Sequence, residues 1–264
     1  MIENKKEFKL ISKKNPKYLL PNALTIFGVC LGLSSIKFAL DTNYTMAVIA
    51  IGFAAILDTL DGRVARLIKG TSKVGKELDS LTDVISFGVA PGFIMYFWAL
   101  NEIGKFGWLF VLIYTVCCAL RLARFNLTTI EESEEWKINF FEGVPSPAAA
   151  GLVLLPLILS LSGLMQVENN AILSLCTILV TSVLMVSKIP TYSFKRIVIP
   201  RNLTVFLLLG IGIFVSLLIF YTFETLFISG LIYFILMPIS YIHYKRKNKK
   251  IKAVSNEEET EDVL

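Results

Sequence analysis

The sequence has few of the groups on which soluble enzymes most often depend. It contains a single histidine, His243, and only 18% of its residues are charged. A histidine-based mechanism is therefore not expected. A soluble globular domain is excluded as well, because 55% of the 264 residues are hydrophobic and the mean hydropathy is +0.66. The composition predicts an integral membrane protein.

Cysteine is also scarce and carries no pattern of its own. The four cysteines all lie within apolar stretches, and their spacing does not resemble that of a metal site: Cys30, Cys117, Cys118 and Cys176. We therefore interpret them as small packing residues and expect neither a zinc site nor a disulfide.

Long hydrophobic runs, by contrast, recur along the whole chain. Eight are each about 20 residues long, which is enough to cross the hydrocarbon core of a bilayer: 19–40, 44–62, 80–100, 106–126, 146–165, 169–188, 203–222 and 225–243. Little sequence remains between them for a separate folded domain. We predict an all-α, polytopic membrane protein with about eight transmembrane helices, in which Pro91, Pro156 and Pro238 kink or end helices locally.

The basic residues are distributed so that nearly all of them would lie on one side of the membrane. All but two of the 26 Lys and Arg residues fall in the arm 1–18, in alternate loops or in the tail 245–264; the exceptions are Lys37 and Lys105. The positive-inside rule then predicts a cytoplasmic-membrane protein with both termini in the cytosol. The arm is either a short interfacial helix or a solvated basic tail. The tail, which ends in acidic residues, is expected to be disordered.

Four aspartates form two pairs at the facing ends of the second and third apolar runs: Asp58 and Asp61, then Asp79 and Asp83. Spacings of three and four place each pair on one face of a helix. Carboxylates near a bilayer are costly and are usually retained for a function. If the two helices face each other, the four anions repel one another unless a cation joins them. Carboxylates suit Mg²⁺, Ca²⁺ or Mn²⁺ rather than zinc, so we predict a divalent-metal site at the cytosolic membrane surface.

Small residues and an arginine accompany the aspartates. Gly62 lets a large group approach the backbone, Ala65 keeps the next turn open, and Gly75 offers a second close approach. Arg66 can pair with a phosphate. A metal, small residues and an arginine together indicate a diphosphate cradle. Asp83 lies deepest in its run and is the best placed of the four carboxylates to act as a general base toward a hydroxyl.

The pattern Asp-x-x-Asp-Gly-x-x-Ala-Arg at 58–66, followed by Gly75, Asp79 and Asp83, resembles the signature of the CDP-alcohol phosphotransferases. Every fixed position is present at the family's spacing. The resemblance implies that Asp58, Asp61 and Asp79 bind Mg²⁺ or Mn²⁺, as two ions, with Asp83 beside them as the base. It further implies a homodimer, and it implies that the CDP site is lined by Gly62, Ala65, Arg66 and Gly75. We expect the six-helix family core at 19–188 and two further helices at 189–244.

Other stretches resemble the bacterial and archaeal phosphatidylserine synthases within that family. They are Pro21-Asn22-x-x-Thr25, Phe87-Gly88-Val89-Ala90-Pro91, Arg121-Leu122-Ala123-Arg124-Phe125-Asn126 and Gly143-Val144-Pro145-Ser146-Pro147. The resemblance implies transfer of the phosphatidyl group from CDP-diacylglycerol to L-serine, with release of CMP. It is clear over about 19–165 and beyond that rests on hydropathy alone.

Several of these residues are candidates for substrate contacts. Asn22 and Thr25 could hydrogen-bond the nucleotide, with helix capping as the alternative. Arg121 and Arg124 are three residues apart and could hold the serine carboxylate or the lipid phosphate through a forked guanidinium, with membrane anchoring as the alternative. Asn126 could orient the serine amino group.

Two other functions fit the pattern less closely. The same chemistry could use glycerol 3-phosphate, inositol phosphate or choline, and a basic loop after the sixth run could serve a phosphorylated acceptor: Lys188, Lys195, Arg196 and Arg201. A cation-coupled transporter also uses intramembrane carboxylates. Transporters usually show repeats and a site at mid-membrane, and the sequence shows neither.

Overall fold

The computed structural model describes residues 19–68, 73–128, 140–165, 170–192 and 203–261. The N-terminal arm therefore lies outside the described residues. The elements are, in order, α1 (Leu19–Leu40), α2 (Tyr44–Leu67), α3 (Lys73–Asp83), the π-helical turn η2 (Val84–Val89), α4 (Ala90–Trp98), the 3₁₀ turn η3 (Leu100–Ile103), α5 (Lys105–Thr128), β1 (Phe140–Glu142), α6 (Ser146–Val153), α7 (Leu155–Ser162), α8 (Asn170–Val186), β2 (Pro190–Tyr192), α9 (Thr204–Phe220) and α10 (Thr222–Glu261). The predicted all-α class is confirmed.

All eight predicted hydrophobic runs are helical. In the described part of the chain, five helical stretches are long and apolar enough to cross a membrane: Leu20–Leu40, Tyr44–Leu67, Val74–Trp98, Lys105–Leu127 and Thr222–Lys247. The helices α8 and α9 are apolar but shorter, with 17 residues each. The fifth run is divided into α6 and α7 around Leu154, two residues before Pro156, which is the local break that the proline predicts.

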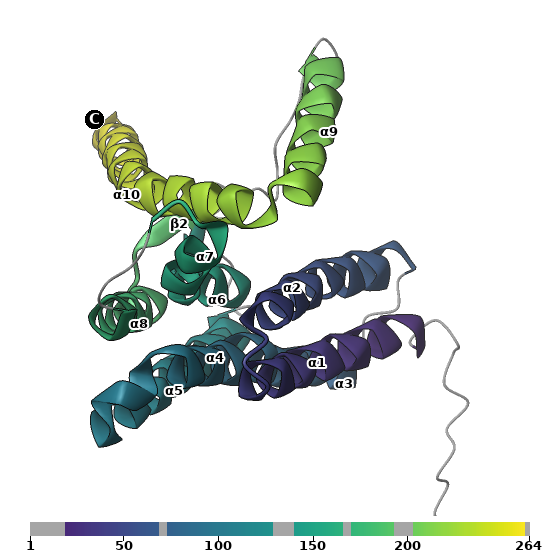
Figure 1. Cartoon of the computed structure of the whole chain (residues 1–264). Coiled ribbons are helices and arrows are strands. Elements are labelled where there is room, and N and C mark those ends of the chain that lie inside the picture. Colours follow the sequence, from purple (N-terminus) through teal and green to yellow (C-terminus); the bar gives the residue numbers. More distant parts are fainter. Residues whose placement is uncertain (1–18, 69–72, 129–139, 166–169, 193–202, 262–264) are drawn as a thin grey trace, which may run out of the picture.

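The helices form two packed groups (Figure 1). The helices α1 and α2 lie side by side and pack on α3, η2 and α4, while α5 connects this group to α6 and α8. The helix α10 lies across α7 and β2. The helix α9 projects away from the rest, and none of its residues is buried. Its side chains are apolar on all sides, as expected of a helix that faces lipid.

The π-helical turn η2 directly follows Asp83 and has a clear local cause. Pro91 lacks an N–H, so the carbonyl of Phe87 four residues earlier has no α-helical donor. The hydroxyl of Tyr114 on α5 donates to that carbonyl at 2.7 Å. Because Tyr114 is fully buried, this bond satisfies a backbone group that water cannot reach. Single π turns inside helices are frequent at functional sites.

A close approach between α1 and η2 depends on a glycine. A Cβ added at Gly32 would lie 2.6 Å from the hydroxyl oxygen of Ser86 and 2.9 Å from its Cα. The two backbones can therefore touch only because position 32 has no side chain, as at many helix contacts in membranes. This contact fixes the segment after Asp83 against the helix that carries Thr25.

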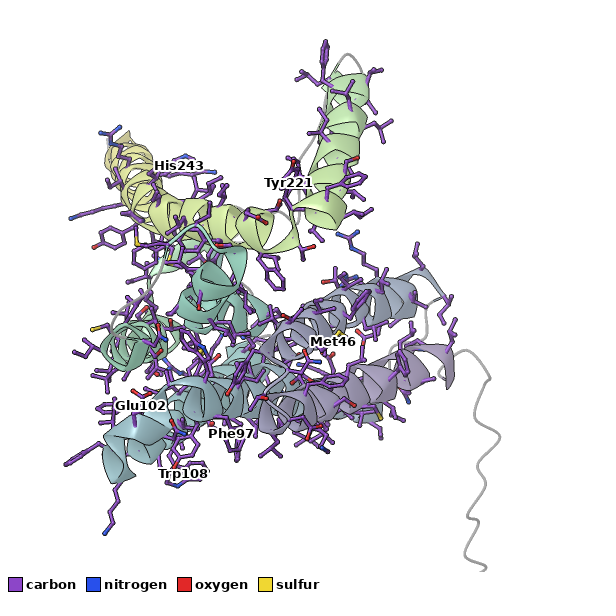
Figure 2. All side chains as sticks on the ribbon, viewed as in Figure 1. Met46, Phe97, Glu102, Trp108, Tyr221 and His243 are labelled. Carbon is purple, nitrogen blue, oxygen red and sulfur yellow. The ribbon has the colours of Figure 1, made fainter. Side chains whose placement is uncertain are left out.

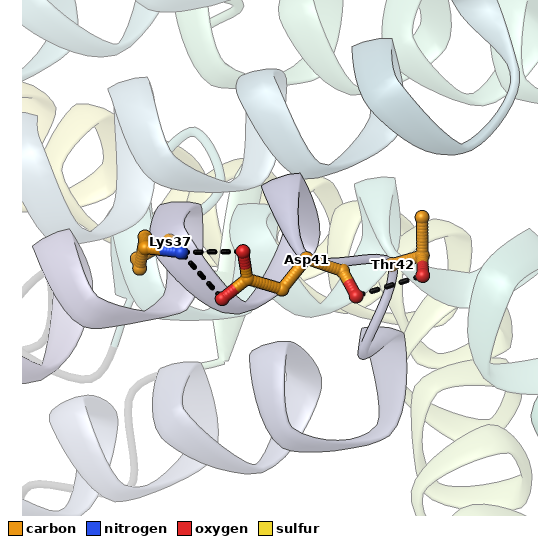
Figure 3. Close-up of polar contacts among 3 residues, drawn as sticks. All are labelled: Lys37, Asp41 and Thr42. Carbon is orange, nitrogen blue, oxygen red and sulfur yellow. Dashed lines mark hydrogen bonds and ion pairs between the residues drawn. The ribbon is translucent and has the colours of Figure 1, made fainter.

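The end of the α1–α2 pair away from the aspartates has the features of a membrane boundary. Lys37 makes an ion pair with the exposed Asp41, and the Thr42 hydroxyl donates to the Asp41 carbonyl at 2.7 Å in the turn between the helices (Figure 3). Phe97 and Trp108 lie at one end of α4 and α5 near Glu102 (Figure 2), within an aromatic cluster that also contains Phe93 and Tyr96. Aromatic belts of this kind mark membrane–water interfaces.

Two short strands were not predicted. The strands β1 and β2 pair antiparallel, with Phe141 opposite Thr191. Gly143 follows β1 with φ of 72°, and an added Cβ there would lie 2.7 Å from the Met185 carbonyl oxygen. The ladder joins the segment before α6 to the segment after α8. Three-residue strands, one of them starting with a proline, leave no alternation pattern to detect.

Two helix boundaries differ from prediction. The third helical stretch begins at Lys73, seven residues before the apolar run, because α3 is amphipathic rather than apolar. The helix α10 continues to Glu261, beyond the apolar run at 225–243, and the expectation of a disordered tail at 245–264 stays a prediction. Lys, Glu and Ala are good helix formers, and extending an existing helix needs no new nucleation.

Replacing Tyr114 with Phe should lower the free energy of unfolding by about 1–2 kcal/mol, because the buried Phe87 carbonyl loses its donor. Thermal unfolding of the purified protein in detergent would measure the change, with the exposed Tyr241→Phe as the matched control. Equal stability of the two variants would contradict this role for the Tyr114 hydroxyl.

Candidate metal and substrate site

Three of the four predicted aspartates meet at one point. Asp58 and Asp61 lie near the C-terminal end of α2, and Asp79 lies in α3. Carboxylate oxygens of the three residues all lie within 4.8 Å of one another. Carboxylates accept hydrogen bonds but cannot donate them when ionised, so the group is repulsive unless a cation lies among its oxygens. The residues therefore fit a divalent cation that prefers oxygen ligands.

Asp61 is held in place by the first helix. Only 4% of its surface is exposed, and its carboxylate accepts a 2.7 Å hydrogen bond from the hydroxyl of Thr25, which is itself 6% exposed. The Pro21 carbonyl, 3.0 Å from the same hydroxyl, is the alternative acceptor. A partner of this kind orients a metal ligand. Thr25 thus has a structural contact that the sequence did not predict, and its contact with a nucleotide stays a prediction.

Asn22 lies half-buried on α1, three residues before Thr25. Both residues are inside α1, which begins at Leu19, so the helix-capping alternative does not apply to them. The spacing of three places the two side chains near one face of the helix. The contact of Asn22 with the nucleotide stays a prediction.

Asp83 is the last residue of α3, where the π-helical turn begins. Its carboxylate lies close to that of Asp58, and the two can share a hydrogen bond only when one of them carries a proton. Its Oδ1 atom is buried and has no hydrogen-bond partner among the described residues. A buried polar atom without a partner requires an explanation, and a substrate hydroxyl or a metal would supply the missing interaction.

Arg121 is a buried cation beside this carboxylate. The side chain comes from α5, is 9% exposed and lies close enough to Asp83 for charge attraction. Its Nη1 atom donates to the hydroxyl of Ser146 on α6 at 2.7 Å, whereas its Nε is buried and has no partner among the described residues. This burial rules out simple membrane anchoring, the alternative considered for Arg121, because an anchoring arginine keeps its charge in water.

Arg124 and Asn126 lie farther along α5 and make different contacts. Arg124 is exposed, and its Nη1 atom donates to the Val186 carbonyl at the end of α8 at 2.9 Å. Asn126 donates to the Ser80 hydroxyl at 2.9 Å, next to Asp79. These contacts connect α5 to α8 and α3. The proposed contacts of both residues with an acceptor stay predictions.

The small residues of the motif lie on α2 and α3, the helices that carry the metal-binding aspartates. Apart from the chain neighbours of Gly62 and the backbone of its own helix, no atom lies within 4 Å of a Cβ added at Gly62, so a ligand has room to approach the backbone there. Ala65 is half-buried, Arg66 is exposed near the end of α2, and Gly75 lies half-buried in the first turn of α3. The placement is compatible with a cradle for a diphosphate. A small cavity behind it is lined by Thr25, Gly28, Ala54, Asp58, Asp61, Thr82, Ser86 and Phe87.

Sequence reasoning did not find two residues next to this site. Ser146 binds Arg121, and the only available signal was its position in the Pro145-Ser146-Pro147 stretch. Tyr233 on α10 lies near Arg121, and nothing in its apolar surroundings indicated a polar role. His243, the single histidine, is exposed on α10 (Figure 2).

Comparisons with known proteins agree with the geometry. A family model described as CDP-alcohol phosphatidyltransferase matches residues 18–191. A CDP-diacylglycerol–serine O-phosphatidyltransferase of Helicobacter pylori (strain ATCC 700392 / 26695) is 39% identical over 241 residues, which cover 89% of this chain and 98% of that protein. The protein of the same name from Mycobacterium leprae (strain TN) is 34% identical over 229 residues, covering 86% of this chain and 76% of that protein.

A third relative of that name, from Bacillus subtilis (strain 168), is 37% identical over 177 residues. The match covers 67% of this chain and 92% of the relative, which is therefore the shorter protein.

Replacing Thr25 with Val should weaken metal binding about 10-fold or more, because Asp61 loses the partner that orients it. Binding of Mn²⁺ to the purified protein, followed by electron paramagnetic resonance, measures this without relying on turnover. The matched control is Thr59→Val, because that exposed hydroxyl bonds only to the Ala55 carbonyl of its own helix in the described structure. Equal Mn²⁺ affinity of the two variants would contradict the role of Thr25.

Proposed function

The chain belongs to the CDP-alcohol phosphatidyltransferase family, and on this premise we propose that it transfers the phosphatidyl group of CDP-diacylglycerol to the hydroxyl of L-serine, giving phosphatidylserine and CMP. The observation that carries the choice of acceptor is the buried Arg121 beside Asp83. An acceptor that bears a carboxylate next to its hydroxyl can place the carboxylate on the guanidinium and the hydroxyl near the base. Relatives named for the serine reaction, matched over most of their length, support the same choice.

The metal site supports this chemistry through its donor set. We propose Mg²⁺ or Mn²⁺, as two ions, bound by Asp58, Asp61 and Asp79, with Asp83 adjacent. When bound, such ions neutralise the charge of the diphosphate and of the leaving CMP. The CDP group would rest on Gly62, Ala65, Arg66 and Gly75, with Arg66 pairing with a phosphate.

The chain's own residues then have distinct roles in the reaction. Arg121 binds and orients the acceptor, and Asp83 accepts the proton of its hydroxyl. The resulting oxygen nucleophile attacks the lipid-side phosphorus, a new P–O bond forms, and the bond from that phosphorus to the CMP oxygen breaks. The electron pair of the broken bond leaves with CMP, so atoms and charge balance. Burial of Arg121 and of the Asp83 Oδ1 atom limits the access of water, which would otherwise compete as the acceptor.

The reaction also requires a site at a membrane boundary. The diacylglycerol chains remain in the bilayer while the CDP group and serine come from water. We propose that the aspartates face the cytosol, as the distribution of Lys and Arg indicates.

Labelling with a membrane-impermeant thiol reagent tests this orientation in a variant without native cysteines. A cysteine introduced at Glu102 should be labelled in intact cells, whereas a cysteine introduced at Lys188 should be labelled only after permeabilisation. The reverse pattern would contradict this orientation.

We propose in addition that the enzyme is a homodimer in the membrane, as the family resemblance implies. Its mass in a lipid nanodisc, measured by light scattering, tests this, and a monomeric mass would contradict it.

Purified protein supplied with CDP-diacylglycerol and Mn²⁺ or Mg²⁺ tests the proposed function. The release of CMP should depend on L-serine, and glycerol 3-phosphate, inositol phosphate and choline should not replace it. Turnover with one of these instead would retain the site and change the acceptor. Of the basic loop considered for a phosphorylated acceptor, Lys188 is exposed, and the other three residues lie outside the described part of the chain. No metal-dependent CMP release with any acceptor would contradict the enzymatic assignment.

The variant Asp83→Asn should lower kcat by about 10²–10⁴-fold, because it removes the base but retains the shape of the side chain. Binding of CDP-diacylglycerol, measured by its effect on thermal unfolding, should remain. The matched control is Asp41→Asn, at the opposite end of α1, where the carboxylate pairs with Lys37. Full activity of the Asp83 variant would contradict its role as the base.

A further inference from the structure

The helix α10 presents a polar stripe to the interior of the protein. Tyr233, Met237 and Ser240 are spaced by four and three, which places them on one face of the helix. Met237 is 5% exposed and Ser240 is fully buried. The hydroxyl oxygens of Tyr233 and Ser240 are both buried and have no hydrogen-bond partner among the described residues. Buried hydroxyl groups that lack a hydrogen-bond partner are costly inside a membrane protein, so these two require an explanation.

The position of this stripe is fixed by close packing. The helix α10 lies against α7 and β2 (Figure 1). A Cβ added at Gly230 would lie 2.6 Å from a methyl carbon of Leu155, so the two helices touch at that point. Tyr233 lies close to Thr191 of β2, but the two hydroxyl groups do not form a hydrogen bond; the Thr191 hydroxyl donates instead to the Gly143 carbonyl at 2.8 Å. The position of Tyr233 is therefore fixed by the packing of α10 against α7 and β2.

Three buried polar atoms in this region have no hydrogen-bond partner among the described residues. They are Oδ1 of Asp83, Nε of Arg121 and the hydroxyl oxygen of Tyr233. Arg121 lies close to both of the other side chains, so it joins the end of α3 to α10. Buried polar groups in folded proteins nearly always have partners. Three such atoms from three helices indicate the place of a small polar ligand.

The chemistry of the three groups identifies which part of the ligand each one would take. A guanidinium donates hydrogen bonds and cannot accept them, and a phenol can donate one. Two neighbouring donors of this kind can bind the two oxygens of a carboxylate. Asp83 is an acceptor and matches a hydroxyl. The triad therefore fits a small hydroxy acid whose carboxylate lies between Arg121 and Tyr233 and whose hydroxyl faces Asp83.

We propose that Tyr233 is an acceptor-binding residue that donates its hydroxyl, together with Arg121, to the carboxylate of the acceptor. The proposal rests on the proposed function, and it assigns to α10 a part of the substrate site. The family match ends at residue 191, so this part of the site lies outside the family domain. Because the family match ends before α10, we expect Tyr233 to contribute to acceptor affinity and not to the chemical step.

Steady-state kinetics of the full-length variant Tyr233→Phe tests this, because the change removes the hydroxyl alone. The KM for L-serine should rise about 10-fold, the loss expected for one hydrogen bond to a charged group. The KM for CDP-diacylglycerol and the kcat should stay within about twofold of their original values. The matched control is Tyr241→Phe on the exposed face of the same helix, which should leave all three constants unchanged.

The outcomes separate the two proposals. If the unmodified protein releases no CMP with L-serine, the proposed function fails before the variant is considered. If the unmodified protein is active and Tyr233→Phe keeps its KM for L-serine, the inference about Tyr233 is overturned. It is also overturned if both KM values, the kcat and the unfolding temperature change together, because that pattern shows a structural role.

Discussion

Crowding of negative charge at one end of the α1–α2 pair is the constraint on which the rest of the site depends. Three carboxylates have oxygens within 4.8 Å of one another, and a fourth lies close to one of them. At the boundary of a bilayer such a group is stable only with a cation among its oxygens or with donors around it. The chain places all four aspartates on helices, which hold ligands more rigidly than loops do. Thr25 from a third helix then fixes the most buried of them.

The scaffold around Asp83 shows how the fold supports this concentration of charge. Pro91 removes one helical donor, a π-helical turn forms, and Tyr114 satisfies the Phe87 carbonyl that the proline leaves open. Gly32 allows α1 to contact the same turn. Arg121 provides a positive charge near Asp83 and is itself held by Ser146. The Asp83 carboxylate thus neighbours both a metal-binding group and a cation, which suits a site where a phosphate donor and a hydroxyl acceptor meet.

Much of the site was predictable from the sequence because the aspartates of each pair are only three or four residues apart. The intervals between Asp58 and Asp61, and between Asp79 and Asp83, determine which residues share a helix face, and the eight apolar runs indicate where the helical stretches lie. The hydrogen bond from Thr25 to Asp61 spans 36 residues, and no periodicity reports a contact at that distance. The β1–β2 ladder and the polar stripe of α10 likewise depend on how helices pack. The continuation of α10 to Glu261 was not visible in the hydropathy, because it depends on the extension of an existing helix and not on apolar side chains.

The most direct test of the metal site is a structure of the protein with Mn²⁺ and CDP-diacylglycerol, determined with anomalous diffraction at the manganese edge. We predict anomalous density among the carboxylates of Asp58, Asp61 and Asp79. The diphosphate should lie on the Gly62 side, and Asp83 should face the lipid-side phosphorus. Bound CDP-diacylglycerol with manganese elsewhere, or with no manganese among these carboxylates, would contradict it.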